Sequence, residues 1–82
     1  MERLPVITYT ISLDTINKVK DFVNMISRFQ SEIDLTSGRY IVDAKSMMGI
    51  FSLDLEKPLQ ISVYDDGEIE ELEKALAPFI TK

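Results

Sequence analysis

The sequence contains no histidine and no cysteine, and only three of its 82 residues are glycine. Without an imidazole, acid–base or nucleophilic chemistry centred on histidine is excluded, and so is any phosphohistidine relay. Without thiols, disulfides and thiolate metal sites are excluded as well. We find no nucleophile–base pair and no glycine-rich phosphate cradle. The sequence therefore predicts a protein that is not an enzyme and needs no cofactor.

Long apolar runs and an excess of positive charge are also missing. No apolar run approaches the ~20 residues that a membrane helix needs, and the chain does not open like a secretory signal. Acidic residues outnumber basic ones by 14 to 9, and the net charge is −5, which disfavours a nucleic-acid partner. We expect a cytoplasmic protein that binds neither nucleic acid nor membrane.

Composition and length favour one small globular domain over residues 1–82. The hydrophobic fraction is 45% and the charged fraction 28%, too apolar for intrinsic disorder. A chain of this size can build one two-layer core.

Alternating patterns predict four strands. Residues 4–11 alternate between apolar and polar side chains, and Pro5 indicates an edge strand because proline cannot donate to a ladder. Two short alternating runs between 32 and 44 flank the stretch 36–39, which predicts a hairpin. A further strand follows Pro58.

Helical spacing predicts three helices. The first begins after Asp14 or Thr15, either of which can cap it. Its apolar face consists of residues spaced three or four apart, which are Ile16, Val19, Phe22, Val23, Ile26 and Phe29. The second is short, over residues 45–52. The third starts near residue 68 and ends before Pro78. The order β-α-β-β-α-β-α predicts an α+β fold, an antiparallel sheet with helices on one face. The helix residues expected to complete its core are Phe22, Ile26, Leu72 and Leu76.

The stretch 44–53, AKSMMGIFSL, resembles the regulatory serine segment of HPr phosphocarrier proteins of the sugar phosphotransferase system, which has the form AKSxMGxxSL. The likeness extends over essentially the whole chain, including the Phe22-Val23 pair and the strand at 61–63. It implies the open-faced β-sandwich of that family, with a four-stranded antiparallel sheet in the order 1-4-2-3.

The chain departs from the family at the start of the first long helix. The family carries a phosphate-accepting histidine there, followed by an arginine, whereas this sequence reads SLDTIN over residues 12–17. An ungapped alignment from Phe22 places Thr15 at the histidine position, and matching the preceding motif places Asp14 there. Neither supplies an imidazole. A phosphate on either residue would need a metal and further acidic groups, so helix capping explains them better.

Ser46 has two interpretations. The resemblance implies that a kinase phosphorylates it, and a dianion at a helix start is favoured by the helix dipole. The other interpretation is an ordinary N-cap. The residues around it could form a partner-binding patch, because methionines on a weak helix repack easily, or they could belong to the core. The expected contact residues are Lys45, Met47, Met48, Ile50 and Phe51, with the two methionines the more exposed.

An acidic run also follows the last strand. It comprises Asp65, Asp66, Glu68, Glu70 and Glu71. The run lacks the ligand spacing of a calcium loop, and its place at a helix start accounts for it, so we predict no metal site.

Two functions fit these residues. The first is a regulatory HPr-like protein without histidine phosphotransfer, switched at Ser46 and binding a serine kinase, a transcriptional regulator or a sugar-transport component. In lacking the histidine and keeping the regulatory serine, it resembles an HPr subgroup that acts in carbon catabolite repression. The second is a constitutive interaction module that binds one partner without modification.

Overall fold

A computed structural model describes residues 4–65 and 67–81. Within them the elements follow the predicted order. They are β1 (Ile7–Ile11), α1 (Ile16–Ile26), β2 (Ile33–Ser37), β3 (Tyr40–Asp43), α2 (Met47–Phe51), β4 (Leu59–Val63) and α3 (Ile69–Leu76). No helix in the described part of the chain is long and apolar enough to span a bilayer.

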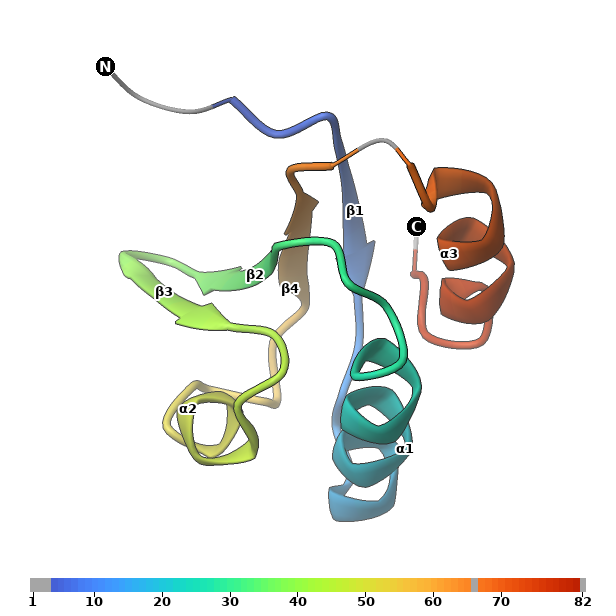
Figure 1. Ribbon diagram of the computed structural model, residues 1–82. Coiled ribbons are helices and arrows are strands. Elements are labelled where there is room, and N and C mark those ends of the chain that lie inside the picture. The colour runs from blue at the N-terminus through green and yellow to red at the C-terminus, as the bar shows by residue number, and fades with distance from the viewer. Residues whose placement is uncertain (1–3, 66, 82) are drawn as a thin grey trace.

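The strands form one antiparallel sheet in the order β1-β4-β2-β3 (Figure 1), which confirms the predicted topology. β1 lies at an edge, as Pro5 indicates. The end of the chain returns to this edge, where the amide of Thr81 donates to the carbonyl of Thr10 at 2.8 Å and that of Ser12 donates to Phe79 at 2.9 Å. β3 is the opposite edge.

The β2–β3 hairpin turns through two residues. Ser37 pairs with Tyr40, so Gly38 and Arg39 form the turn between them. Gly38 has a φ of +59°, and a glycine with positive φ at the first central position is typical of the tight turns that join twisted strands. The predicted hairpin is therefore confirmed.

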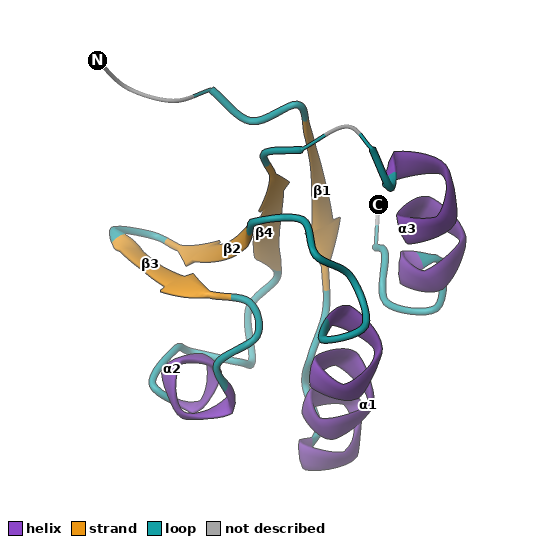
Figure 2. Ribbon diagram, in the orientation of Figure 1, coloured by secondary structure: helices purple, strands orange, loops and turns teal. Residues whose placement is uncertain are grey.

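The helices pack on one face of the sheet (Figure 2), and the core lies between the two layers. The predicted core residues Phe22, Ile26, Leu72 and Leu76 are all buried. The ring of Phe79, beyond the end of α3, meets the ring of Phe22 edge-on, with centroids 5.6 Å apart. Such a pair adds to the area that each ring buries.

The apolar face of α1 is shorter than its spacing predicts. Ile16, the first residue of α1, is 63% exposed. At the other end the helix stops at Ile26, and Phe29 lies in the following turn, where its amide donates to the carbonyl of Ile26 at 3.1 Å. Phe29 still packs against the core.

Candidate functional site

Ser46 caps the start of α2. Its backbone is extended, with φ −98° and ψ 104°, and its hydroxyl oxygen accepts from the amide of Gly49 at 3.1 Å. The Ser46 carbonyl accepts from Ile50 at 3.0 Å. At the far end of the helix, the hydroxyl of Ser52 donates to the Gly49 carbonyl at 2.5 Å. Hydroxyls thus close both ends of a helix that is only five residues long.

Gly49 lets α2 approach β3 closely. A Cβ atom at this position would lie 3.1 Å from the Cβ of Val42 and 3.3 Å from the Oγ of Ser46. Both distances are shorter than ordinary van der Waals contact. The glycine that interrupts the helical pattern in the sequence therefore fits the helix against the sheet and leaves room for the cap.

The predicted contact residues divide between surface and core. Met48 is 84% exposed and Phe51 42% exposed, while Met47 is half-buried against the core. Ile50 is fully buried. The prediction that Ile50 is available to a partner is therefore wrong: α2 has one inward face, and Ile50 fills it.

Lys45 reaches away from α2. Its ammonium donates to the carbonyl of Phe29 at 2.6 Å, in the turn after α1. Its own amide donates to the carboxylate of Asp43 at 2.8 Å. The side chain thus joins the entry of α2 to the end of α1, and it is half-buried.

At the start of α1 the structure distinguishes the roles of Asp14 and Thr15. Thr15 is the N-cap, and its hydroxyl oxygen accepts from the amide of Lys18 at 3.1 Å. Asp14 pairs with the ammonium of Lys18 at 2.9 Å. The hydrogen bond and the positive charge of Lys18 lower the pKa of the Asp14 carboxyl. Both residues therefore serve the helix start, which lies at the same end of the molecule as α2 (Figure 1).

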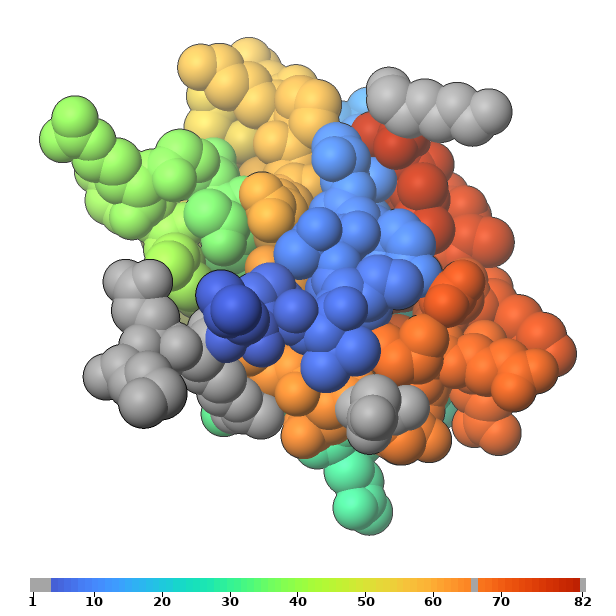
Figure 3. Space-filling model, turned by 90° about the horizontal axis from the view of Figure 1, so that it is seen from above, coloured from blue at the N-terminus to red at the C-terminus, as the bar shows by residue number. Residues whose placement is uncertain are grey.

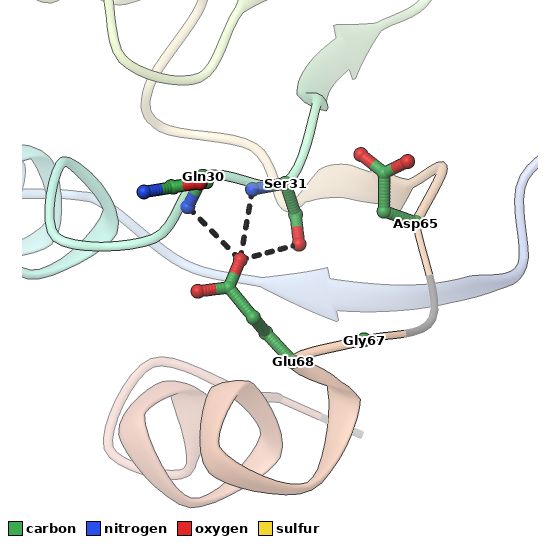
Figure 4. Close-up of a pocket in the computed structure, with 5 residues that line it drawn as sticks. All are labelled: Gln30, Ser31, Asp65, Gly67 and Glu68. Atoms are coloured by element: carbon green, nitrogen blue, oxygen red, sulfur yellow. Dashed lines mark hydrogen bonds between the residues drawn. The ribbon is translucent and has the colours of Figure 1, made fainter.

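Glu68 makes a contact that the sequence does not reveal. One of its carboxylate oxygens accepts three hydrogen bonds, from the amides of Gln30 and Ser31, both at 2.9 Å, and from the Ser31 hydroxyl at 2.8 Å (Figure 4). The Ser31 hydroxyl contributes most to lowering the Glu68 pKa, and the charge of Lys45 acts in the same direction. We call this contact the Glu68 clasp.

Another residue of the acidic run, Asp65, contacts the same segment of the chain. The carboxylate of Asp65 accepts from the amide of Glu32 at 2.8 Å, and Asp66 lies outside the described residues. In the described part of the chain, no group of three or more acidic residues is arranged to hold a metal ion. Asp65 and Glu68 therefore tie the connection between β4 and α3 to the segment that joins α1 to β2.

Comparison with known proteins places this geometry in a family. Residues 16–82 match the model described as "PTS HPr component phosphorylation site". The match begins directly after Thr15, so Asp14 and Thr15 lie outside it. No curated protein matches the chain.

Two solved structures share the fold. One is HPr-C-His from Thermoanaerobacter tengcongensis, with a TM-score of 0.75 and 30% identity over 89% of each chain. Another is the phosphocarrier protein HPr from Bacillus anthracis str. Ames, with a TM-score of 0.70 and 26% identity over 92% of this chain and 96% of that one. The sheet order, the serine-capped α2 and a family match over most of the chain agree: the chain belongs to the HPr family.

Proposed function

We propose that this chain, as a single domain over residues 1–82, is a cytoplasmic regulatory HPr-like protein that does not transfer phosphate through histidine. It acts by contact with proteins in the regulation of sugar uptake and carbon use. The observation that carries the proposal is the absence of histidine from a chain of this family. At the corresponding helix start, Thr15 is occupied as a cap and Asp14 as an ion-pair partner.

Ser46 is the proposed switch. Its hydroxyl lies at the start of α2 and is only half-buried, so a kinase can reach it with local opening. A phosphoryl group would bring a dianion to the helix end that favours negative charge. It would also place that charge beside the exposed Met48.

The proposed contact surface is the outer side of α2. Met48 and Phe51 are its exposed apolar side chains, and Met47 is half-buried. Methionine side chains adapt their shape to different partners. A phosphate at the edge of this surface would add recognition by arginines of a partner protein.

The proposal is tested by incubating the protein with ATP and an HPr-type serine kinase, then locating phosphate by mass spectrometry. We expect one phosphate at Ser46 and none in the Ser46→Ala variant. Ser52→Ala, which removes the hydroxyl at the other end of α2, is the matched control and should be labelled like the wild type. No labelling of Ser46 under conditions that label a true HPr would reject the switch.

The second candidate is a constitutive interaction module, favoured by the use of the Ser46 hydroxyl as a helix cap. It predicts that a kinase, regulator or transport component binds the unmodified protein and the Ser46→Ala variant equally. Binding that requires phosphate on Ser46 would exclude it. Loss of binding in Met48→Ser alone would place the contact on α2 in either case.

A further inference from the structure

A pocket of positive character lies beside α2, at the other end from Ser46. It is lined by the β2–β3 turn and by the loop that follows α2. Its lining residues include Arg39 from the turn, Tyr40 at the start of β3, and Ser52, Leu53 and Lys57 from the loop. Figure 3 shows these two segments, green and gold, next to each other on the molecule.

Charge sets this pocket apart from the two others described. The pocket at the Glu68 clasp is lined by two acidic side chains and no basic one. A second pocket has Lys45 among three acidic side chains. Arg39 and Lys57 face only Asp54 in the third. Although the chain has a net charge of −5, basic side chains outnumber acidic ones in the lining of this pocket, which suits it to an anion.

The two cations are available to a ligand. Arg39 makes no ion pair within the described part of the chain. Lys57 lies 3.9 Å from the carboxylate of Asp54, and the two side chains are 77% and 52% exposed. An exposed pair of that length contributes little and exchanges readily with a competing carboxylate. Both basic side chains can therefore turn to an incoming anion.

The pocket lining also includes two large apolar or aromatic side chains, Tyr40 and Leu53. The Tyr40 side chain is 72% exposed, whereas Leu53 is almost buried and forms part of the floor. A free inorganic ion makes no use of such side chains. An acidic peptide does, because its carboxylates can meet the cations while its aliphatic or aromatic side chains lie on Tyr40.

The pocket continues the α2 surface. The amides of Ser52 and Leu53 donate to the carbonyls of Gly49 and Ile50, at 3.1 and 3.0 Å, so the loop wall is held directly to the last turn of α2. Phe51 thus lies between the exposed Met48 and the pocket along the chain. A partner bound to the outer side of α2 can therefore contact the pocket at the same time.

We propose that the pocket between the β2–β3 turn and the α2–β4 loop binds an acidic segment of the partner protein, extending the α2 contact surface. This deepens the proposed function and rests on it for the partner's docking to α2. Arg39 and Lys57 supply the charge complementarity, and Tyr40 the apolar contact.

The test is a titration of the full chain with a short poly-glutamate peptide that contains one phenylalanine. Binding is monitored through the NMR chemical shifts of the backbone amides. We expect saturable shifts at Gly38, Tyr40 and Ser52. The variant R39Q/K57Q should bind about two- to fivefold more weakly for each cation removed. The control K20Q/R28Q changes net charge equally, at one position on α1 and one in the turn that follows it, and should bind like the wild type.

Equal weakening of binding in both double variants would show that only the net charge of the protein matters, and it would overturn the proposal. The absence of localised shifts in the wild type would overturn it as well. The same titration with inorganic phosphate should give no saturable shifts, and equal binding of phosphate would show a simple anion site instead. Neither result depends on phosphorylation of Ser46. Failure of the kinase experiment would therefore leave this test decisive.

Discussion

At the scale of single residues, Glu68 joins three donor groups at one carboxylate oxygen. Its carboxylate holds two backbone amides and a hydroxyl of the turn that leads from α1 into β2. Hydrogen bonds to a charged acceptor are stronger than neutral ones. One side chain thus fixes the start of α3 against a loop that is remote in sequence.

Replacing Glu68 by glutamine keeps the shape of the side chain and removes its charge. We expect a lower urea midpoint at pH 7, because the three donors then face a neutral acceptor. Glu71→Gln is the matched control, since Glu71 is exposed in the first turn of the same helix. An equal loss in both variants would mean that helix-end charge, and not the clasp, stabilises the fold.

Gly49 offers a second prediction. Gly49→Ala would bring a Cβ within 3.1 Å of the Cβ of Val42, which cannot move without shifting β3. The overpacking outweighs the gain in helix propensity, and we expect a loss of about 1 kcal/mol in the free energy of unfolding.

The control is Gly67→Ala, because no atom lies within 4 Å of a Cβ built there. That variant should unfold like the wild type in the same urea titration. A Gly49→Ala protein as stable as the wild type would show that α2 can move away from β3 freely.

At the scale of elements, periodicity predicted most of the fold. Apolar side chains alternate with polar ones in β1 and β4, and they recur every three or four residues in α1 and α3. Both patterns indicate which side chains face the core. Pro5 and Pro78 mark an edge strand and a helix end, because proline lacks an amide proton and restricts the residue before it. Each of these signals depends on residues that are close together in the chain, so it can be seen in a single sequence.

What the sequence could not reveal depends on distant contacts. The bonds between Glu68 and Ser31 join residues 37 apart, and no local pattern marks that pairing. A five-residue helix is too short for periodicity to show its inward face, so the sequence places Ile50 wrongly on the contact surface. The cap of Ser46 on Gly49, by contrast, spans three residues and follows from local sequence.

The cap of α1 carries a prediction of its own. Thr15→Ala should cost about 1 kcal/mol in the free energy of unfolding, the usual value for losing an N-cap hydroxyl. Thr15→Ser keeps the oxygen that accepts from Lys18 and should cost less. Thermal or urea unfolding of the two variants measures the difference, and equal losses would contradict a capping role.

At the scale of the whole molecule, two carboxyls link stability to pH. The pKa of Asp14 and that of Glu68 are lowered from their ordinary values of 3.8 and 4.5. The unfolded chain therefore binds protons first as the pH falls. Stability from these groups is fully present above those values and is lost as the pH drops through the lower, folded pKa of each.

We therefore expect the urea midpoint to fall on acidification below about pH 5. The Glu68→Gln variant should show a shallower fall, because it lacks one of the two linked groups. A variant that loses stability with acid as steeply as the wild type would show that Glu68 is not linked to folding.

At the level of the whole chain, we propose as the central claim that this HPr fold, which lacks histidine, conveys its signal through contact and not through a phosphate passed from the sugar phosphotransferase system. Incubation with phosphoenolpyruvate and the first enzyme of that system, followed by mass spectrometry, tests it most directly, with a true HPr in a parallel reaction. We predict that the HPr is labelled and that this chain gains no phosphate. Phosphate found on Asp14 or Thr15 would contradict the claim.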